Sequence, residues 1–87
     1  MDDSVVRRML KAARSNDKWQ FKRYLSEIGR NNCLDVLRVV LGVLDSGIPY
    51  TFLDTSRDII DSAIKSARSL DSGIDLVKLK KRVQGKI

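Results

Sequence analysis

The chain has 87 residues, with 17 Lys and Arg against 11 Asp and Glu, one cysteine and no histidine. This composition excludes a disulfide framework, a zinc site of the usual kind and the Ser–His or Cys–His pairs of common hydrolases. We therefore expect a single domain over residues 1–87 that is not an enzyme, needs no cofactor and holds no metal.

The charge is unevenly distributed along the chain. Residues 1–30 carry eight Lys and Arg against four acids, residues 31–77 carry four against seven, and residues 78–87 carry five and no acid. Both ends are therefore basic, while the middle is acidic. Such asymmetry indicates a polyanion or an acidic protein surface as the partner. The alternative is that the charge only keeps a small protein soluble.

The first half of the chain has apolar residues at the spacing of amphipathic helices. We predict one helix over residues 3–14 and a second over 17–28, because apolar residues recur in each at i, i+3, i+4 and i+7. Gly29 is typical of the left-handed position that ends a helix, and Asn31 or Asn32 can cap the next one.

A third helix is predicted over residues 33–46, where apolar residues nearly encircle the helix axis. A helix of this kind is central, covered by its neighbours or by another subunit. The β-branched residues in this stretch are also compatible with a buried strand, but its length favours a helix. The predicted fold is therefore all-α, a small four- to five-helix bundle around this helix.

The second half of the chain is predicted to hold two more helices. Residues 48–53 form a connector that is too apolar to be fully exposed, and the fourth helix is expected to start near Thr55, with Thr55 and Asp58 as a capping box. The last helix is predicted over residues 75–84, although residues 74–80 also alternate as in a short strand.

One five-residue pattern occurs twice, since residues 70–74 repeat the sequence of residues 44–48. An internal duplication would explain it, but the flanking sequences do not match. We prefer two helix-stop signals, with Gly47 and Gly73 each just beyond a helix end.

An acidic cluster is the strongest candidate for metal chemistry. Asp54, Asp58 and Asp61 are spaced so that they would share one helix face, which would suit Mg²⁺. Acids are also common in the first turns of a helix, where they meet its positive end. We favour this second interpretation and expect no metal site.

Basic residues on the first two predicted helices are the main candidates for a binding site. Trp19 lies near them, outside the apolar face of its helix, where it could stack on an unpaired base, anchor a protein interface or be half covered by its own domain. The candidate nucleic-acid-binding residues of this region are Arg7, Arg8, Lys11, Arg14, Lys18, Trp19, Lys22 and Arg23.

A second basic patch lies near the end of the chain, where a frayed, solvated tail over residues 78–87 is an equally good interpretation. A helix-turn-helix is not supported, because the third helix offers almost no hydrogen-bonding side chains and the last one offers lysines suited to phosphates. The candidate residues of this patch are Lys78, Lys80, Lys81 and Arg82.

The function expected from these features is non-specific binding of DNA or RNA phosphates, alone or as an accessory subunit of a nucleic-acid-processing complex. The alternative is a protein-interaction module, in which the third helix and residues 48–53 form a docking or dimer surface and the bases meet an acidic partner. No stretch is apolar enough to span a membrane, and the acidic start of the chain does not resemble a signal peptide. We therefore expect a reducing, cytoplasmic location, or the nucleus in a eukaryotic or viral protein.

Overall fold

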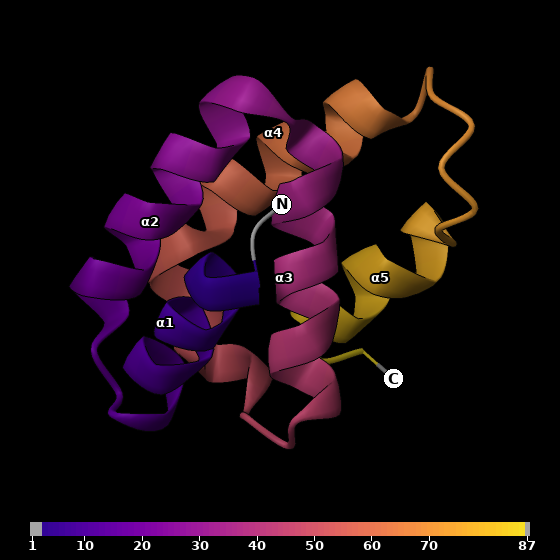
Figure 1. Cartoon of the computed structure of the whole chain (residues 1–87). Coiled ribbons are helices and arrows are strands. Elements are labelled where there is room, and N and C mark those ends of the chain that lie inside the picture. Colours follow the sequence, from indigo (N-terminus) through magenta and orange to yellow (C-terminus); the bar gives the residue numbers. More distant parts are fainter. Residues whose placement is uncertain (1–2, 87) are drawn as a thin grey trace.

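Helix α3 lies at the centre of the computed structural model, which describes residues 3–86 (Figure 1). The elements, in chain order, are α1 (Asp3–Arg14), α2 (Lys18–Asn31), α3 (Cys33–Asp45), the 3-10 helix η1 (Tyr50–Ser56), α4 (Arg57–Ala67) and α5 (Leu76–Val83). Helices α1, α2 and α4 pack against α3, while α5 packs against α4 and η1. Residues 3–86 contain no strand, so the predicted all-α bundle is confirmed.

The core is built around α3, as its apolar composition predicted. Met9 of α1, Leu25 of α2, Ile60 of α4 and Leu79 of α5 are also fully buried. Burial of each such side chain contributes about 1.5–3 kcal/mol. The chain's own helices therefore cover most of α3. Its buried residues are Val36, Leu37, Val39, Val40 and Val43.

Local capping chemistry sets several of the helix ends. The side chain of Asp17 accepts a hydrogen bond from the Gln20 amide at 3.1 Å, and that of Asp75 accepts one from the Lys78 amide at 3.0 Å. Gly47, at φ +81°, follows the end of α3 in the left-handed conformation that glycine adopts without strain. The predicted starts of the second and last helices and the predicted end of the third helix are therefore confirmed.

The prediction that Gly29 ends the second helix is wrong. Helix α2 continues to Asn31, and the backbone N–H of Asn32 bonds to the carbonyl of Ile28. The Asn32 side chain accepts from the Leu34 amide at 2.9 Å and so begins α3, as predicted. A Cβ at position 29 would lie 3.3 Å from Cγ2 of Val36, so α2 and α3 approach closely here and leave little room for a larger side chain.

The predicted capping box at Thr55 and Asp58 is also wrong. The connector forms η1, which runs directly into α4 at Arg57, and no side chain caps that junction. The apolar connector is part of the core, because Phe52 is buried and forms a T-shaped ring pair with Phe21, at a centroid distance of 5.1 Å. Tertiary packing of the connector thus overrides the local capping signal.

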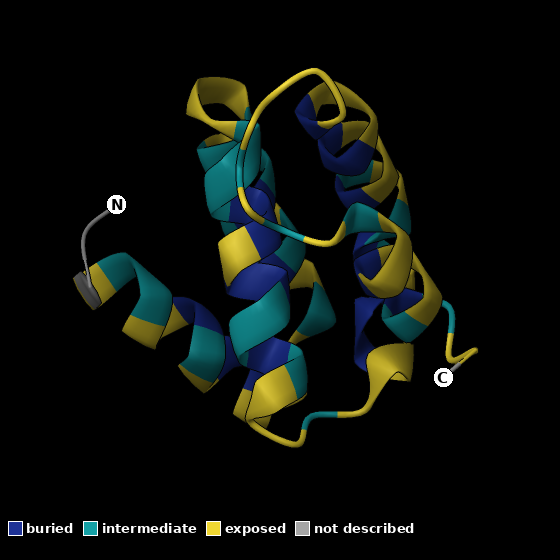
Figure 2. Cartoon of the chain, turned by 90° about the vertical axis from the view of Figure 1, so that its right-hand side faces the viewer, coloured by how far each residue is buried: buried dark blue, intermediate teal, exposed yellow. Residues whose placement is uncertain are grey.

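The second glycine stop signal is misplaced as well. Helix α4 ends at Ala67, well before Gly73, which has φ +73° within the connection to α5. Figure 2 shows that this connection is exposed over most of its length. The following segment is helical, so the strand alternative for residues 74–80 is wrong.

Helix α5 is fixed to the rest of the molecule at its C-terminal end. It buries Leu79 and Val83, and Nη2 of Arg57 donates a hydrogen bond to the Val83 carbonyl at 3.2 Å. Gly85 adopts φ +72° and lies so close to the ring of Tyr50 that any side chain there would collide with it. The basic residues of this region therefore sit on a helix that is packed against the core.

Candidate nucleic-acid interface

Helix α1 presents its basic residues to solvent because the opposite side of the helix is buried. Met9 and Ala13 face the core. Arg7, Lys11 and Arg14 recur at i, i+4 and i+7 and are exposed. None of them forms an ion pair with another residue of the described chain, and the same holds for the exposed Arg8. Their charge is therefore available to an external anion.

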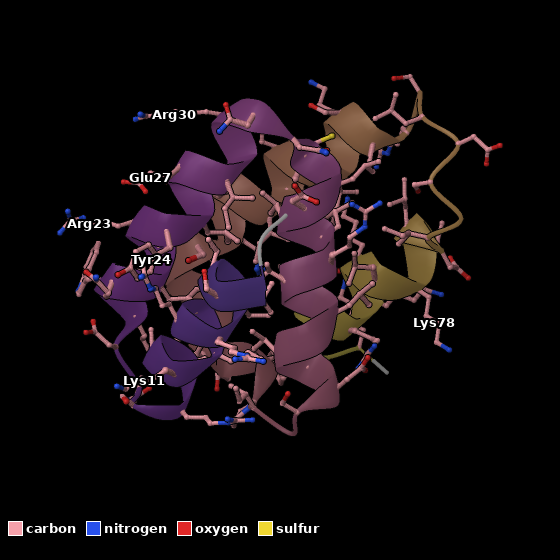
Figure 3. All side chains as sticks on the ribbon, in the orientation of Figure 1. Lys11, Arg23, Tyr24, Glu27, Arg30 and Lys78 are labelled. Atoms are coloured by element: carbon pink, nitrogen blue, oxygen red, sulfur yellow. The ribbon has the colours of Figure 1, made fainter. Side chains whose placement is uncertain are left out.

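A groove between α1 and α2 places two of these cations beside polar side chains of α2. Arg8 and Lys11 line it from α1, and Gln20 and Tyr24 line it from α2. The groove has a volume of about 400 Å³, and Asp17 is the acidic residue in its lining. Lys11 and Tyr24 are labelled in Figure 3. Two cations beside a phenol and an amide offer several donors to a phosphate.

A second hollow lies at the turn between α1 and α2, where Arg14 and Lys18 come together. It is also lined by Ile48, Pro49 and Phe52, and it has a volume of about 400 Å³. Lys18 is half-buried and has no ion pair with a described residue. The basic region thus extends around the end of the helical hairpin.

Lys22 and Arg23 do not continue the basic face of α1 together, although they are neighbours in sequence. Nζ of Lys22 lies 3.6 Å from Oδ1 of Asp58, so this lysine is directed toward α4. Arg23 is exposed and points outward from α2 (Figure 3). Only Arg23 of this pair presents an unpaired charge.

Trp19 is the most exposed large apolar side chain of the described residues, with 72% of its surface accessible. The interpretation that its own domain half covers it is therefore wrong. Nζ of Lys22 lies 5.9 Å from the centre of the indole ring, within the range of a cation–π contact. An exposed indole beside cations is suited to stacking on an unpaired base.

Arg30 lies on the same side of α2 as Trp19 and Arg23, but it was not predicted as a site residue from the sequence. It is exposed in the last turn of α2 and points to the same side as Arg23 (Figure 3). The helix was predicted to end at residue 28, so Arg30 was not assigned to a helix face. Its spacing from Trp19 and Arg23, at i+11 and i+7, is the signal that could have found it. Glu27 is the acidic residue on this side of α2.

The second basic patch lies on the other side of the molecule. Figure 3 shows Lys78 of α5 far from Lys11 of α1. Lys80 and Lys81 are exposed and have no ion pair with a described residue, but Nη2 of Arg82 lies 2.9 Å from Oδ1 of Asp45. The two groups of cations therefore belong to separate surfaces, and one member of the second is already neutralised.

The acidic residues considered for metal binding are divided between two elements. Asp54 lies on η1, where its carboxylate accepts a hydrogen bond from Nη2 of Arg57 at 3.1 Å. Asp58 lies on α4 and contacts Lys22. Within residues 3–86, no group of three or more Cys, Asp or Glu side chains is placed to hold a metal ion.

No helix of the described residues has both the length and the apolar character that crossing a bilayer requires. Comparisons of the chain with protein-family models, curated protein sequences and solved structures found no match. The function must therefore be inferred from the charge, exposure and geometry of the chain's own residues.

Proposed function

We propose that the protein binds the phosphate backbone of DNA or RNA without sequence preference, as a non-enzymatic binding protein or accessory subunit. The observation that carries this proposal is a group of cations around the α1–α2 hairpin that form no ion pair with a described residue. Its members are Arg7, Arg8, Lys11, Arg14, Lys18, Arg23 and Arg30. Each phosphate that such a cation neutralises releases a condensed counterion, which favours binding regardless of base sequence.

Base-specific recognition is not part of the proposal. A helix that reads the major groove must expose hydrogen-bonding side chains. Helix α3 is the helix that would follow a turn near Gly29, but five of its residues are buried in the core, and its polar residues Asp35 and Arg38 pair with each other. The exposed side chains of α1 and α2 are mainly Lys and Arg on flexible stems, which suit phosphate contact.

Trp19 supports a preference for single strands. Its indole is exposed, and it lies on the same helix as Arg23 and Arg30. Stacking on an aromatic ring tolerates any base, because every base has a π face. Paired bases in a duplex are not accessible for such stacking, so the contribution of Trp19 is expected only with unpaired nucleotides.

The test is fluorescence anisotropy with labelled, mixed-sequence single-stranded and duplex oligonucleotides over a series of salt concentrations. We expect a dissociation constant on the order of 10⁻⁴–10⁻⁶ M at physiological salt and a log-linear loss of affinity as salt rises. The double variant Lys11→Gln/Arg14→Gln should weaken binding to all sequences and reduce the salt slope by roughly two.

A matched control removes the same amount of charge elsewhere. Lys65 and Arg68, at the C-terminal end of α4, are exposed, form no ion pair with a described residue and line neither of the hollows at the α1–α2 hairpin. The variant Lys65→Gln/Arg68→Gln should therefore keep the parent's salt slope. If the parent fails to bind even at low salt, or if both double variants lose the same affinity, the proposed function is wrong.

A further inference from the structure

A groove between α4 and α5 combines an apolar lining with a basic rim. The apolar lining is formed by Ile64 of α4 with Leu76 and Val77 of α5, and the groove has a volume of about 250 Å³. Val77 is 68% exposed, which makes it the most exposed aliphatic side chain among the large apolar residues of the described chain. An apolar residue that the fold leaves this open is available to contact another molecule.

The charges around this groove all have the same sign. Arg68 directly follows α4. Lys80 and Lys81 lie on α5, and Lys86 lies just beyond its end. Among the described residues, no Asp or Glu lines the groove, and none forms an ion pair with these four cations. An occupant that carries negative charge next to an apolar surface would therefore complement the groove.

We propose that this groove binds a short acidic, amphipathic segment of a partner protein. An apolar side chain of that segment contacts Val77, Leu76 and Ile64, and its flanking carboxylates meet the cationic rim. Short amphipathic helices are bound in grooves in this way, with apolar anchors on one face. Complementary charge around the anchor selects the partner and speeds association.

Two features of the groove favour a peptide over other ligands. Its apolar residues Ile64, Leu76 and Val77 offer nothing to a phosphate or a sugar, and no aromatic side chain of the described residues lines it for a base to stack on. Its volume of about 250 Å³ lies below the range of about 300–1,000 Å³ typical of small-molecule sites. It can hold an apolar anchor but not a whole cofactor. This surface is separate from the α1–α2 hairpin, so the inference does not rest on the proposed function.

The test uses a fluorescein-labelled synthetic peptide with Leu at helical spacing on one face and Glu at the other positions. The control peptides are polyglutamate and a version in which Ser replaces each Leu. Fluorescence anisotropy measures the binding, and we expect only the amphipathic peptide to bind saturably. Polyglutamate should bind only weakly, because it has charge without an anchor.

Variants of the full chain separate the two parts of the groove. Val77→Glu should weaken peptide binding at least tenfold while the melting curve stays close to the parent's, because Val77 is largely exposed. Lys80→Glu/Lys81→Glu should have a similar effect, and Lys65→Glu, an α4 cation outside the groove, should not.

Three results would overturn the inference. The first is equal affinity for the amphipathic peptide and the version with Ser. The second is unchanged affinity in Val77→Glu, with folding verified by circular dichroism. The third is Val77-dependent sedimentation of the protein with phosphatidylserine vesicles without peptide binding, which would assign the groove to a lipid surface instead.

Discussion

Arg82 of α5 and Asp45 at the end of α3 face each other with Nη2 and Oδ1 2.9 Å apart, although 37 positions separate them in the chain. The pair joins the last helix to the central one. The Asp45 side chain is largely exposed and that of Arg82 partly exposed, so water and salt screen their attraction. Arg82 was predicted from the sequence to bind phosphate, but its charge is instead paired with Asp45.

Replacing Arg82 with Gln should therefore have small effects. We expect the free energy of unfolding in urea to fall by less than about 1 kcal/mol, as is usual for an exposed ion pair. Nucleic-acid affinity and its salt slope should stay at the parent's values. A decrease of the slope by about one unit in this variant would show that Arg82 leaves Asp45 to bind a phosphate.

Leu37 and Leu41 of α3 should differ in their contribution to stability. Leu37 is fully buried, whereas Leu41 is only partly buried. Leu37→Ala should cost about 2–5 kcal/mol, because the cavity it leaves adds to the lost transfer free energy. Leu41→Ala should cost clearly less. Urea denaturation of both variants measures the difference, and equal losses would contradict the burial described for α3.

Position 29 should tolerate alanine much better than leucine. Alanine in a helix interior is favoured over glycine by roughly 0.5–1 kcal/mol. This gain offsets a slight displacement of Val36, whose Cγ2 would lie 3.3 Å from the new Cβ. Gly29→Ala should therefore be close to neutral. Gly29→Leu should lose about 1–3 kcal/mol because it forces α2 and α3 apart. Thermal melts followed by circular dichroism distinguish the two, and a stable leucine variant would contradict the close approach.

Trp19→Ala should change binding without changing stability. The side chain is 72% exposed, so we expect the free energy of unfolding to change by no more than about 0.5 kcal/mol. Affinity for single strands should fall about 5- to 150-fold, which corresponds to the loss of one stacked base at about 1–3 kcal/mol. Affinity for duplexes should stay the same.

The parent protein offers an independent measurement of the same contact. Trp19 is the single tryptophan of the chain, so the tryptophan fluorescence comes from this position alone. Stacking on a base should change its emission when single-stranded oligonucleotide is added. Unchanged emission at saturation would exclude Trp19 from the interface, even if the cations bind.

Addition of Mg²⁺ should leave the melting temperature unchanged. Asp54 and Asp58 lie on different elements and contact Arg57 and Lys22, respectively. A ligand that binds only the folded state must raise its stability. A saturable increase in melting temperature that Asp58→Asn abolishes would contradict this prediction.

Local chemistry accounts for the features of the fold that were predictable. The capping side chains of Asn32 and Asp75 and the left-handed Gly47 act within a few residues of their own positions, so a sequence pattern is enough to find them. Gly29 and Thr55 were misinterpreted because tertiary contacts decide their roles. The first depends on the approach of Val36, and the second on the packing of the connector.

The candidate binding surfaces also differ in whether local spacing or tertiary packing determines them. The exposed bases of α1 follow from helical periodicity, because Met9 marks the opposite, buried side of the same helix. The direction of Lys22 depends on how α2 packs against α4, which its own helix does not reveal. The α4–α5 groove needs Ile64 and Val77 on two helices joined by a long exposed connection, so no sequence spacing predicts it.

The separation of α1 and α5 to opposite sides of the bundle has a consequence for assembly (Figure 1). If both proposed surfaces bind their ligands, a ligand on one side would not block the other, so the two binding events would not compete. The chain would then hold two different molecules at once and raise the local concentration of one beside the other. Its effect on either molecule would then depend on proximity, with no conformational change required in the bundle.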